Sequence, residues 1–109
     1  MLRIGAIVLH VADTKRSAAF WSEALAYDRG ENPDFLRPRV GGGARLHLDD
    51  SDRTHLDLWT ESAEEQASEV ARLIGLGASL VDWDYPEDAD FVVLVDPGGT
   101  LFCVIDTSR

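Results

Sequence analysis

Residues 55–78 read HLDLWTESAEEQASEVARLIGLGA, and this stretch decides the fold. Its first residues alternate in character, as they do in a strand that buries one face. Ser62 and Glu65 then form an S-x-x-E capping box, in which side chains satisfy the free amides that open a helix. Apolar residues follow at helical spacing: Ala67, Val70, Leu73 and Ile74. Because Gly77 is placed to end a helix, the stretch predicts a strand and then a helix from about Ala63 to Leu76.

The same order occurs 49 residues earlier in the chain. When Ala6–His10 is placed over His55–Trp59, Asp13 falls on Ser62, and both are good helix N-caps. A helix is therefore predicted from about Thr14 to Ala26. Its apolar residues are Phe20, Trp21, Ala24 and Leu25, and we expect the two aromatic ones in the core. A repeat of this length indicates two copies of one structural unit.

The remaining apolar segments predict strands, with one more short strand within Leu25–Arg29. The strands are expected at Ile4–Val11, Phe35–Val40, Arg45–Asp49, Thr54–Trp59, Leu80–Tyr85, Phe91–Val95 and Leu101–Ile105. Gly41–Gly43 and Asp96–Gly99 are typical of hairpin connections. The prediction is an α+β chain made of two tandem β-α-β-β-β modules. They form one domain, with the first module at about residues 1–50 and the second at about 51–109.

Composition narrows the functional classes. The chain has 109 residues and a net charge of −10, which argues against binding to nucleic acid or to an anionic membrane surface. An acidic surface attracts cations, although it also serves solubility alone. One cysteine rules out an intramolecular disulfide, and no apolar run is long enough to span a membrane. The N-terminus lacks the zones of a signal peptide, so we expect a cytoplasmic protein.

Strand alternation places all three histidines on the sheet face opposite the helices. His10 belongs to the first strand, His47 and Asp49 to the strand over Arg45–Asp49. The strand that opens the second module contributes His55, Asp57 and Trp59 to the same face. Such polar groups are costly to bury unpaired, so this face is either exposed to solvent or lines a binding cavity. Trp59 and Trp83 favour the cavity, because aromatic walls with a few polar groups are typical of small-molecule sites.

The stretch IVLHVADTKRSAAFWSEALAY at residues 7–27 resembles the opening of vicinal-oxygen-chelate proteins, which include glyoxalases, bleomycin-resistance proteins and extradiol dioxygenases. The glyoxalase-like subgroup is similar to this chain in two stretches, residues 55–78 and FVVLVDPGGTLFCVID at residues 91–106. The resemblance covers nearly the whole chain. It implies a curved mixed sheet around a cavity, with the helices on its outer face, and a homodimer. It constrains function less than fold, because one fold hosts many chemistries.

The resemblance also implies where a metal would bind. Its three positions fall on Ala6, His55 and Cys103, and an alanine cannot bind a metal. Imidazole with a single thiolate is a poor site for the divalent ions of the family, so we expect no metal or other cofactor. The alternative is an improvised site that joins His55 to His47 or Asp49.

These observations predict a small-molecule-binding protein that sequesters a cationic or aromatic compound. The expected ligand-binding residues are His10, His47, Asp49, His55, Asp57, Trp59, Trp83 and Cys103. Cys103 is either such a contact or a small buried hydrophobe. One alternative is a metal-dependent lyase, isomerase or dioxygenase, and another is an interaction module without a ligand. The sequence assigns no catalytic residue.

Overall fold

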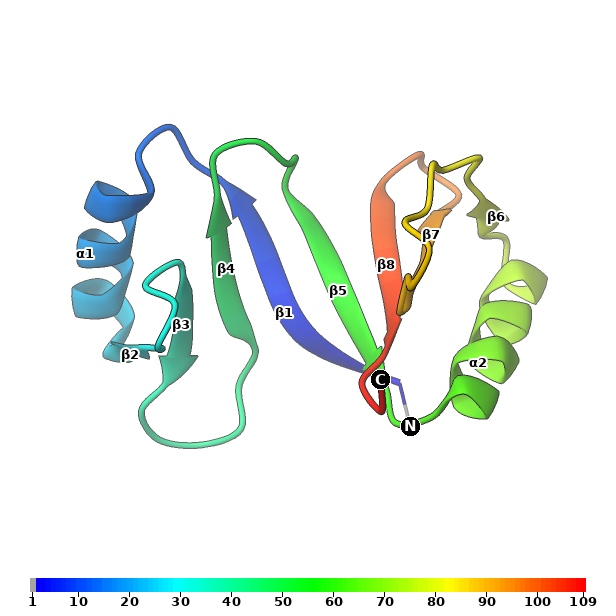
Figure 1. The fold of residues 1–109 in the computed structure, drawn as a ribbon, viewed down its shortest axis with the longest axis horizontal. Helices are drawn as coiled ribbons and strands as arrows, with labels where there is room; N and C mark the ends of the chain where they lie inside the picture. Colours follow the sequence, from blue (N-terminus) through cyan, green and yellow to red (C-terminus); the bar gives the residue numbers. More distant parts are fainter. Residues whose placement is uncertain (1) are drawn as a thin grey trace. The chain divides into compact units, whose positions relative to one another are not determined.

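The computed structural model describes residues 2–109, and their elements repeat one order (Figure 1). The first module contains β1 (Arg3–His10), α1 (Thr14–Leu25), β2 (Tyr27–Arg29), β3 (Phe35–Pro38) and β4 (Arg45–Asp49). The second contains β5 (His55–Thr60), α2 (Ala63–Gly75), β6 (Ser79–Leu80), β7 (Phe91–Val95) and β8 (Leu101–Asp106). The predicted α+β class and the two β-α-β-β-β modules are confirmed. Neither helix has the length and apolar character that crossing a membrane requires within residues 2–109.

The chain divides into two compact units that follow these modules closely. One unit is Gly5–Thr54, and the other is His55–Arg109 together with residues 2–4. The start of β1 therefore packs with the second module, although most of the strand belongs to the first. Leu2 contacts the core of the second module, which anchors this end of the chain there.

In the first module the strand order is β2-β3-β4-β1. β1 and β4 run parallel, whereas β2, β3 and β4 pair antiparallel. The core on the helix side contains Ala18 of α1 with Leu36, Leu46 and Leu48, and Ile7 and Leu9 pack against it. The predicted alternation is therefore confirmed for β1 and β4, since their other residues lie on the opposite face.

The second module has the corresponding order β5-β8-β7-β6, with β5 and β8 parallel. Its buried core is Ala78, Leu94 and Val104, against which Val70 and Leu73 of α2 pack. The side chain of Gln66 also ties α2 to the sheet, because its Nε2 donates to the carbonyl oxygens of Asp90 and Val104, both at 3.0 Å. Burial of a few aliphatic side chains thus fixes which sheet face the helix covers.

Both predicted helix starts are present. The Asp13 carboxylate accepts from the backbone N–H of Arg16 at 3.1 Å, and the Ser62 hydroxyl accepts from Glu65 at 3.0 Å. The Glu65 carboxylate reaches the backbone N–H of Glu61 at 2.8 Å, one residue before the cap. At the other end of α2, Gly77 adopts a φ of 116°, as the sequence led us to expect of the residue that stops the helix.

Two expectations are wrong, one about packing and one about the extent of a strand. Phe20 is 61% exposed and forms a T-shaped pair with Trp21, with ring centroids 5.0 Å apart, so it is not a core residue. Of the predicted strand over Leu80–Tyr85 only Leu80 belongs to a strand, β6, because the backbone N–H of Val93 donates to the Tyr85 hydroxyl at 2.8 Å. A side chain thus takes the place of a strand carbonyl, and the ladder ends.

Candidate functional site

His55 and Asp57 form the polar part of one face of β5. They are two residues apart, so alternation points both side chains away from α2. His55 Nε2 lies 3.2 Å from Asp57 Oδ1, and the two side chains are only 10% and 17% exposed. The sequence predicted this shared face, and the structure adds that the imidazole and the carboxylate are in contact.

Cys103 joins this pair through the register of the sheet. β5 and β8 are parallel, and Asp57 is the direct partner of Cys103. One ligand atom from each of His55, Asp57 and Cys103 lies within 4.8 Å of the other two. All three side chains are half-buried. We call these three residues the β5–β8 cluster.

The surroundings of the β5–β8 cluster are apolar on one side and charged on the other. Val93 of β7 pairs with Cys103 and is 3% exposed, so the thiol has a dry neighbour. Trp59 follows Asp57 on the same face, and the guanidinium of Arg3 lies 5.5 Å from the centre of its ring. Arg3 also approaches Glu61, with 3.7 Å between Nη1 and Oε1. A half-buried polar cluster with an aromatic neighbour is a suitable place to hold a small ligand.

His47 and Asp49 lie on the corresponding face of the first module. His47 stacks on Phe35, with 4.1 Å between ring centroids and 12° between planes. Its Nε2 is 3.9 Å from Asp49 Oδ2, a looser contact than that of His55 with Asp57. The sequence predicted both as ligand contacts. In the structure His47 also packs on Phe35, and Asp49 also forms a turn.

Asp49 organises the turn that leaves β4. Its Oδ1 accepts from the backbone N–H of Ser51 at 2.7 Å, from that of Asp52 at 2.9 Å, and from the Ser51 hydroxyl at 2.8 Å. These hydrogen bonds, that of the Ser51 amide first, lower the pKa of Asp49 to about 2. The carboxylate is therefore charged at neutral pH and occupied with local structure.

His10 is exposed and is tied to the same turn. Its backbone N–H donates to the Thr54 hydroxyl at 3.0 Å, and its ring Nδ1 lies 2.8 Å from the carbonyl oxygen of Asp52. Because a carbonyl only accepts, Nδ1 carries the proton in this contact. The remaining predicted residue, Trp83, is 41% exposed on the irregular segment between β6 and β7.

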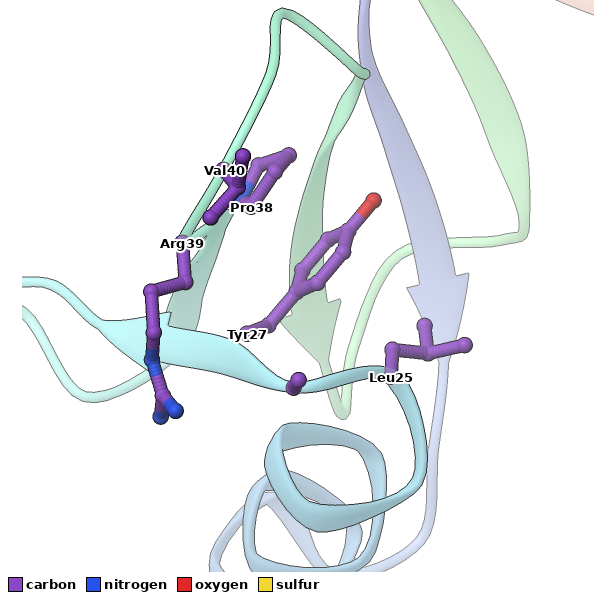
Figure 2. Close-up of a pocket in the computed structure, with 6 residues that line it drawn as sticks. Leu25, Tyr27, Pro38, Arg39 and Val40 are labelled. Carbon is purple, nitrogen blue, oxygen red and sulfur yellow. The ribbon is translucent and has the colours of Figure 1, made fainter.

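A small apolar hollow lies at the end of α1, where it meets β2 and β3 (Figure 2). It has a volume of about 180 Å³ and is lined by Leu25, Ala26, Tyr27, Pro38, Arg39 and Val40. None of the predicted ligand residues lines it. Val40 is 88% exposed, so the hollow is shallow on that side.

A second pocket in the first module was not predicted from the sequence. Its volume is about 260 Å³, and its lining residues are Gly30, Glu31, Asn32, Phe35, Arg37 and Arg45. Alternation placed Arg45 on the face opposite the helix, but only the pairing of β3 with β4 brings Arg45 and Phe35 together. The residue pattern within each strand, taken alone, could not have revealed this pocket.

Comparison with known proteins identifies the family. Residues 6–105 match the model of the glyoxalase-like domain, which is nearly the whole chain. The chain belongs to the glyoxalase-like family. The resemblance to the vicinal oxygen chelate superfamily seen in the sequence is thereby confirmed. No functionally curated protein shows significant sequence similarity to the chain.

Solved structures agree on the fold at low sequence identity. Methylmalonyl-CoA epimerase from Mycobacterium tuberculosis superposes with a TM-score of 0.64 at 17% identity, covering 97% of this chain and 88% of the other. A glyoxalase/bleomycin resistance protein/dioxygenase superfamily member from Vibrio splendidus 12B01 gives 0.59 at 18%, covering 97% and 99%. The Mn(II)-bound glyoxalase from Novosphingobium aromaticivorans gives 0.64 at 19%, covering 98% of this chain and 38% of the other. At such identities the superpositions establish the fold alone.

The metal chemistry implied by the glyoxalase-like family can be tested against the residues present. Ala6 carries no ligand atom, and it is 2% exposed, so the first position of the family's set is filled by a buried methyl group. His55 and Cys103 do carry ligand atoms, and Asp57 supplies a third beside them. Imidazole, carboxylate and thiolate together suit Zn²⁺, whereas Mn²⁺ prefers oxygen ligands. The residues therefore fit a zinc ion bound within the second module alone.

Proposed function

We propose that the protein is a zinc-dependent, small-molecule-binding member of the glyoxalase-like family, with the ion held by the β5–β8 cluster. The observation that carries the proposal is the approach of one nitrogen, one oxygen and one sulfur ligand atom to within 4.8 Å. Around a tetrahedral Zn²⁺ such atoms lie roughly 3.4–3.7 Å apart. The three side chains project from neighbouring strands, so the proposal requires side-chain rotation alone to reach that spacing.

The expectation that the chain lacks a metal considered only His55 and Cys103 as ligands, and it left out Asp57. It stays a prediction, and our proposal departs from it because the sheet register adds the carboxylate. His55, Asp57 and Cys103 would supply three ligands, the number that is typical of catalytic rather than structural zinc. A bound zinc ion supplies Lewis acidity to an oxygen atom of a ligand.

The chain's own residues assign the remaining roles. In the metal-free chain the contact between His55 and Asp57 keeps the imidazole, which is 10% exposed, beside the carboxylate. Val93 limits the access of water from the β7 side. Trp59 offers an aromatic surface beside the cluster. We infer that the ligand is a small compound with an oxygen donor and an apolar or flat part.

The experiment is to dialyse the purified protein against a slight molar excess of zinc and to measure bound metal by mass spectrometry. We expect one zinc per chain, retained against an excess of Mn²⁺. His55→Ala, Asp57→Ala and Cys103→Ser should each lose most of it. His10→Ala is the matched control, because His10 is an exposed histidine of the first module. Absence of zinc from the unmodified protein, or equal zinc in all variants, would refute the proposal.

A second candidate function is metal-free sequestration of a cationic or aromatic compound. The observation in its favour is the position of Arg3 over Trp59, since it shows that this ring accepts a cation on its face. Thermal-shift measurements with cationic aromatic compounds decide between the two functions. Stabilisation that persists in Cys103→Ser and needs no metal would support sequestration, whereas stabilisation only with zinc present would support the first proposal.

A further inference from the structure

Two arginines line the 260 Å³ pocket of the first module, in a chain that has twice as many acidic as basic residues. Arg37 belongs to β3 and Arg45 to β4, and Phe35 lies with them in the lining. Glu31 is the one acidic residue that lines this pocket within residues 2–109. The pocket therefore has an excess of one positive charge, against the sign of the whole chain.

The guanidinium of Arg45 is held in place by stacking. It lies 5.1 Å from the centre of the Phe35 ring, which also stacks on the imidazole of His47 with 4.1 Å between centroids. Arg45 is half-buried, and its Nε is completely buried. Stacking on an aromatic face restrains a guanidinium in one place.

The acidic register partner of Arg37 is paired with a different arginine. Asp28 of β2 is the register partner of Arg37, but its Oδ1 accepts from Nε of Arg39 at 3.0 Å. Arg39 lines the other hollow, not this pocket. Arg37 is exposed and its long side chain is free to turn towards a bound anion.

We propose that this pocket binds a small oxyanion-bearing compound, with Arg45 as the fixed anchor and Arg37 as the mobile one. Guanidinium groups bind carboxylate and phosphate through paired, charge-assisted hydrogen bonds. A volume of about 260 Å³ suits a compound about the size of benzoate. The edge of Phe35 would contact the apolar part of the compound. The site uses neither zinc nor any residue of the β5–β8 cluster, so it stands apart from the proposed function.

Isothermal titration calorimetry with benzoate, inorganic phosphate and benzylammonium tests this assignment. We expect at least one of the two anions to bind and benzylammonium not to bind. Binding of phosphate without benzoate would identify a free inorganic anion as the ligand, and binding of benzoate would identify a carboxylate. Arg45→Gln should weaken the binding of the anion by roughly tenfold or more, and Arg37→Gln by a few-fold. Arg16→Gln on α1 changes the net charge equally and should leave binding unchanged.

Glu31→Gln serves as a second test, because it predicts a gain of binding, which misfolding could not produce. It removes the pocket's carboxylate from an exposed loop position, so anion binding should become several-fold tighter. The tightening should shrink in high salt, because screening weakens the charge that it reflects. Benzylammonium binding as well as benzoate, no binding of either anion, or Glu31→Gln without effect would each overturn the proposal.

Discussion

Asp57 and Cys103 are direct partners on the parallel strands β5 and β8. In a parallel pair, residues opposite each other point to the same face of the sheet. The thiol therefore lies beside the carboxylate, and His55, two residues before Asp57, completes the group. The candidate metal site thus depends on the geometry of one sheet, and on no loop.

Replacing Asp49 tests the turn that follows β4. Asp49→Ala removes the acceptor of three hydrogen bonds, so we expect the free energy of unfolding to fall by about 1–2 kcal/mol at pH 7. Asp49→Asn should cost less, because an amide oxygen still accepts. Denaturant unfolding measures both, and Asp50→Ala, at the exposed neighbouring position, serves as the control.

The stabilisation by Asp49 should depend on pH in a defined direction. Folding lowers the pKa of this carboxyl from 3.8 to about 2, so the charged form is favoured in the folded state. Its contribution is complete above pH 4 and disappears as the pH falls through about 2. The gap between the wild type and Asp49→Ala should therefore narrow between pH 4 and 2. A gap that stays constant over this range would contradict the assignment.

Two neighbouring glycines at the end of α2 should respond in opposite directions to alanine. Gly77 has a φ of 116°, and an added Cβ would lie 3.1 Å from Cγ of Pro97. Gly77→Ala should therefore lower stability by about 1–3 kcal/mol. Gly75 is the last residue of the helix and has open space around it, so Gly75→Ala should raise stability by about 0.5–1 kcal/mol. Thermal unfolding of the two variants gives the comparison, and equal shifts would count against this geometry.

Replacing two serines of the second module, one at the N-cap of α2 and one inside the helix, tests the cap. Ser62→Ala removes the acceptor for the Glu65 amide and should cost about 1 kcal/mol. Ser68→Ala changes an exposed residue inside the same helix and should be neutral or slightly stabilising, because alanine is the better helix former. If both substitutions had the same effect on the free energy of unfolding, the cap would have no special role.

Much of the fold was predictable because its signals are local. The caps at Asp13 and Ser62, and the alternation in β1, β4 and β5, depend only on neighbouring residues. The segment Leu80–Tyr85 was mistaken for a strand because its pattern alternates, while the hydroxyl of Tyr85 competes for the Val93 amide. Such competition between a side chain and the backbone is not visible in periodicity.

The candidate site was predictable only in part, for a related reason. Alternation placed His55 and Asp57 on one face, and the structure finds them in contact. The approach of Cys103 to Asp57, and of Arg45 to Phe35, depends on the register between strands. Register is set by the packing of whole strands, so a single sequence does not reveal it. The cavity and dimer implied by the resemblance stay predictions, as does a metal site joining His55 to His47 or Asp49.

The most direct test of the central claim is the absorption spectrum of the protein with Co²⁺ in place of zinc. Coordination by the thiolate of Cys103 predicts a sulfur-to-cobalt charge-transfer band in the near ultraviolet, saturating at one equivalent. The band should vanish in Cys103→Ser, and it should weaken or shift in Asp57→Asn while remaining unchanged in Asp82→Asn, an exposed position of the same module. A spectrum without this band, or one unaffected by Cys103→Ser, would contradict a metal site at the β5–β8 cluster.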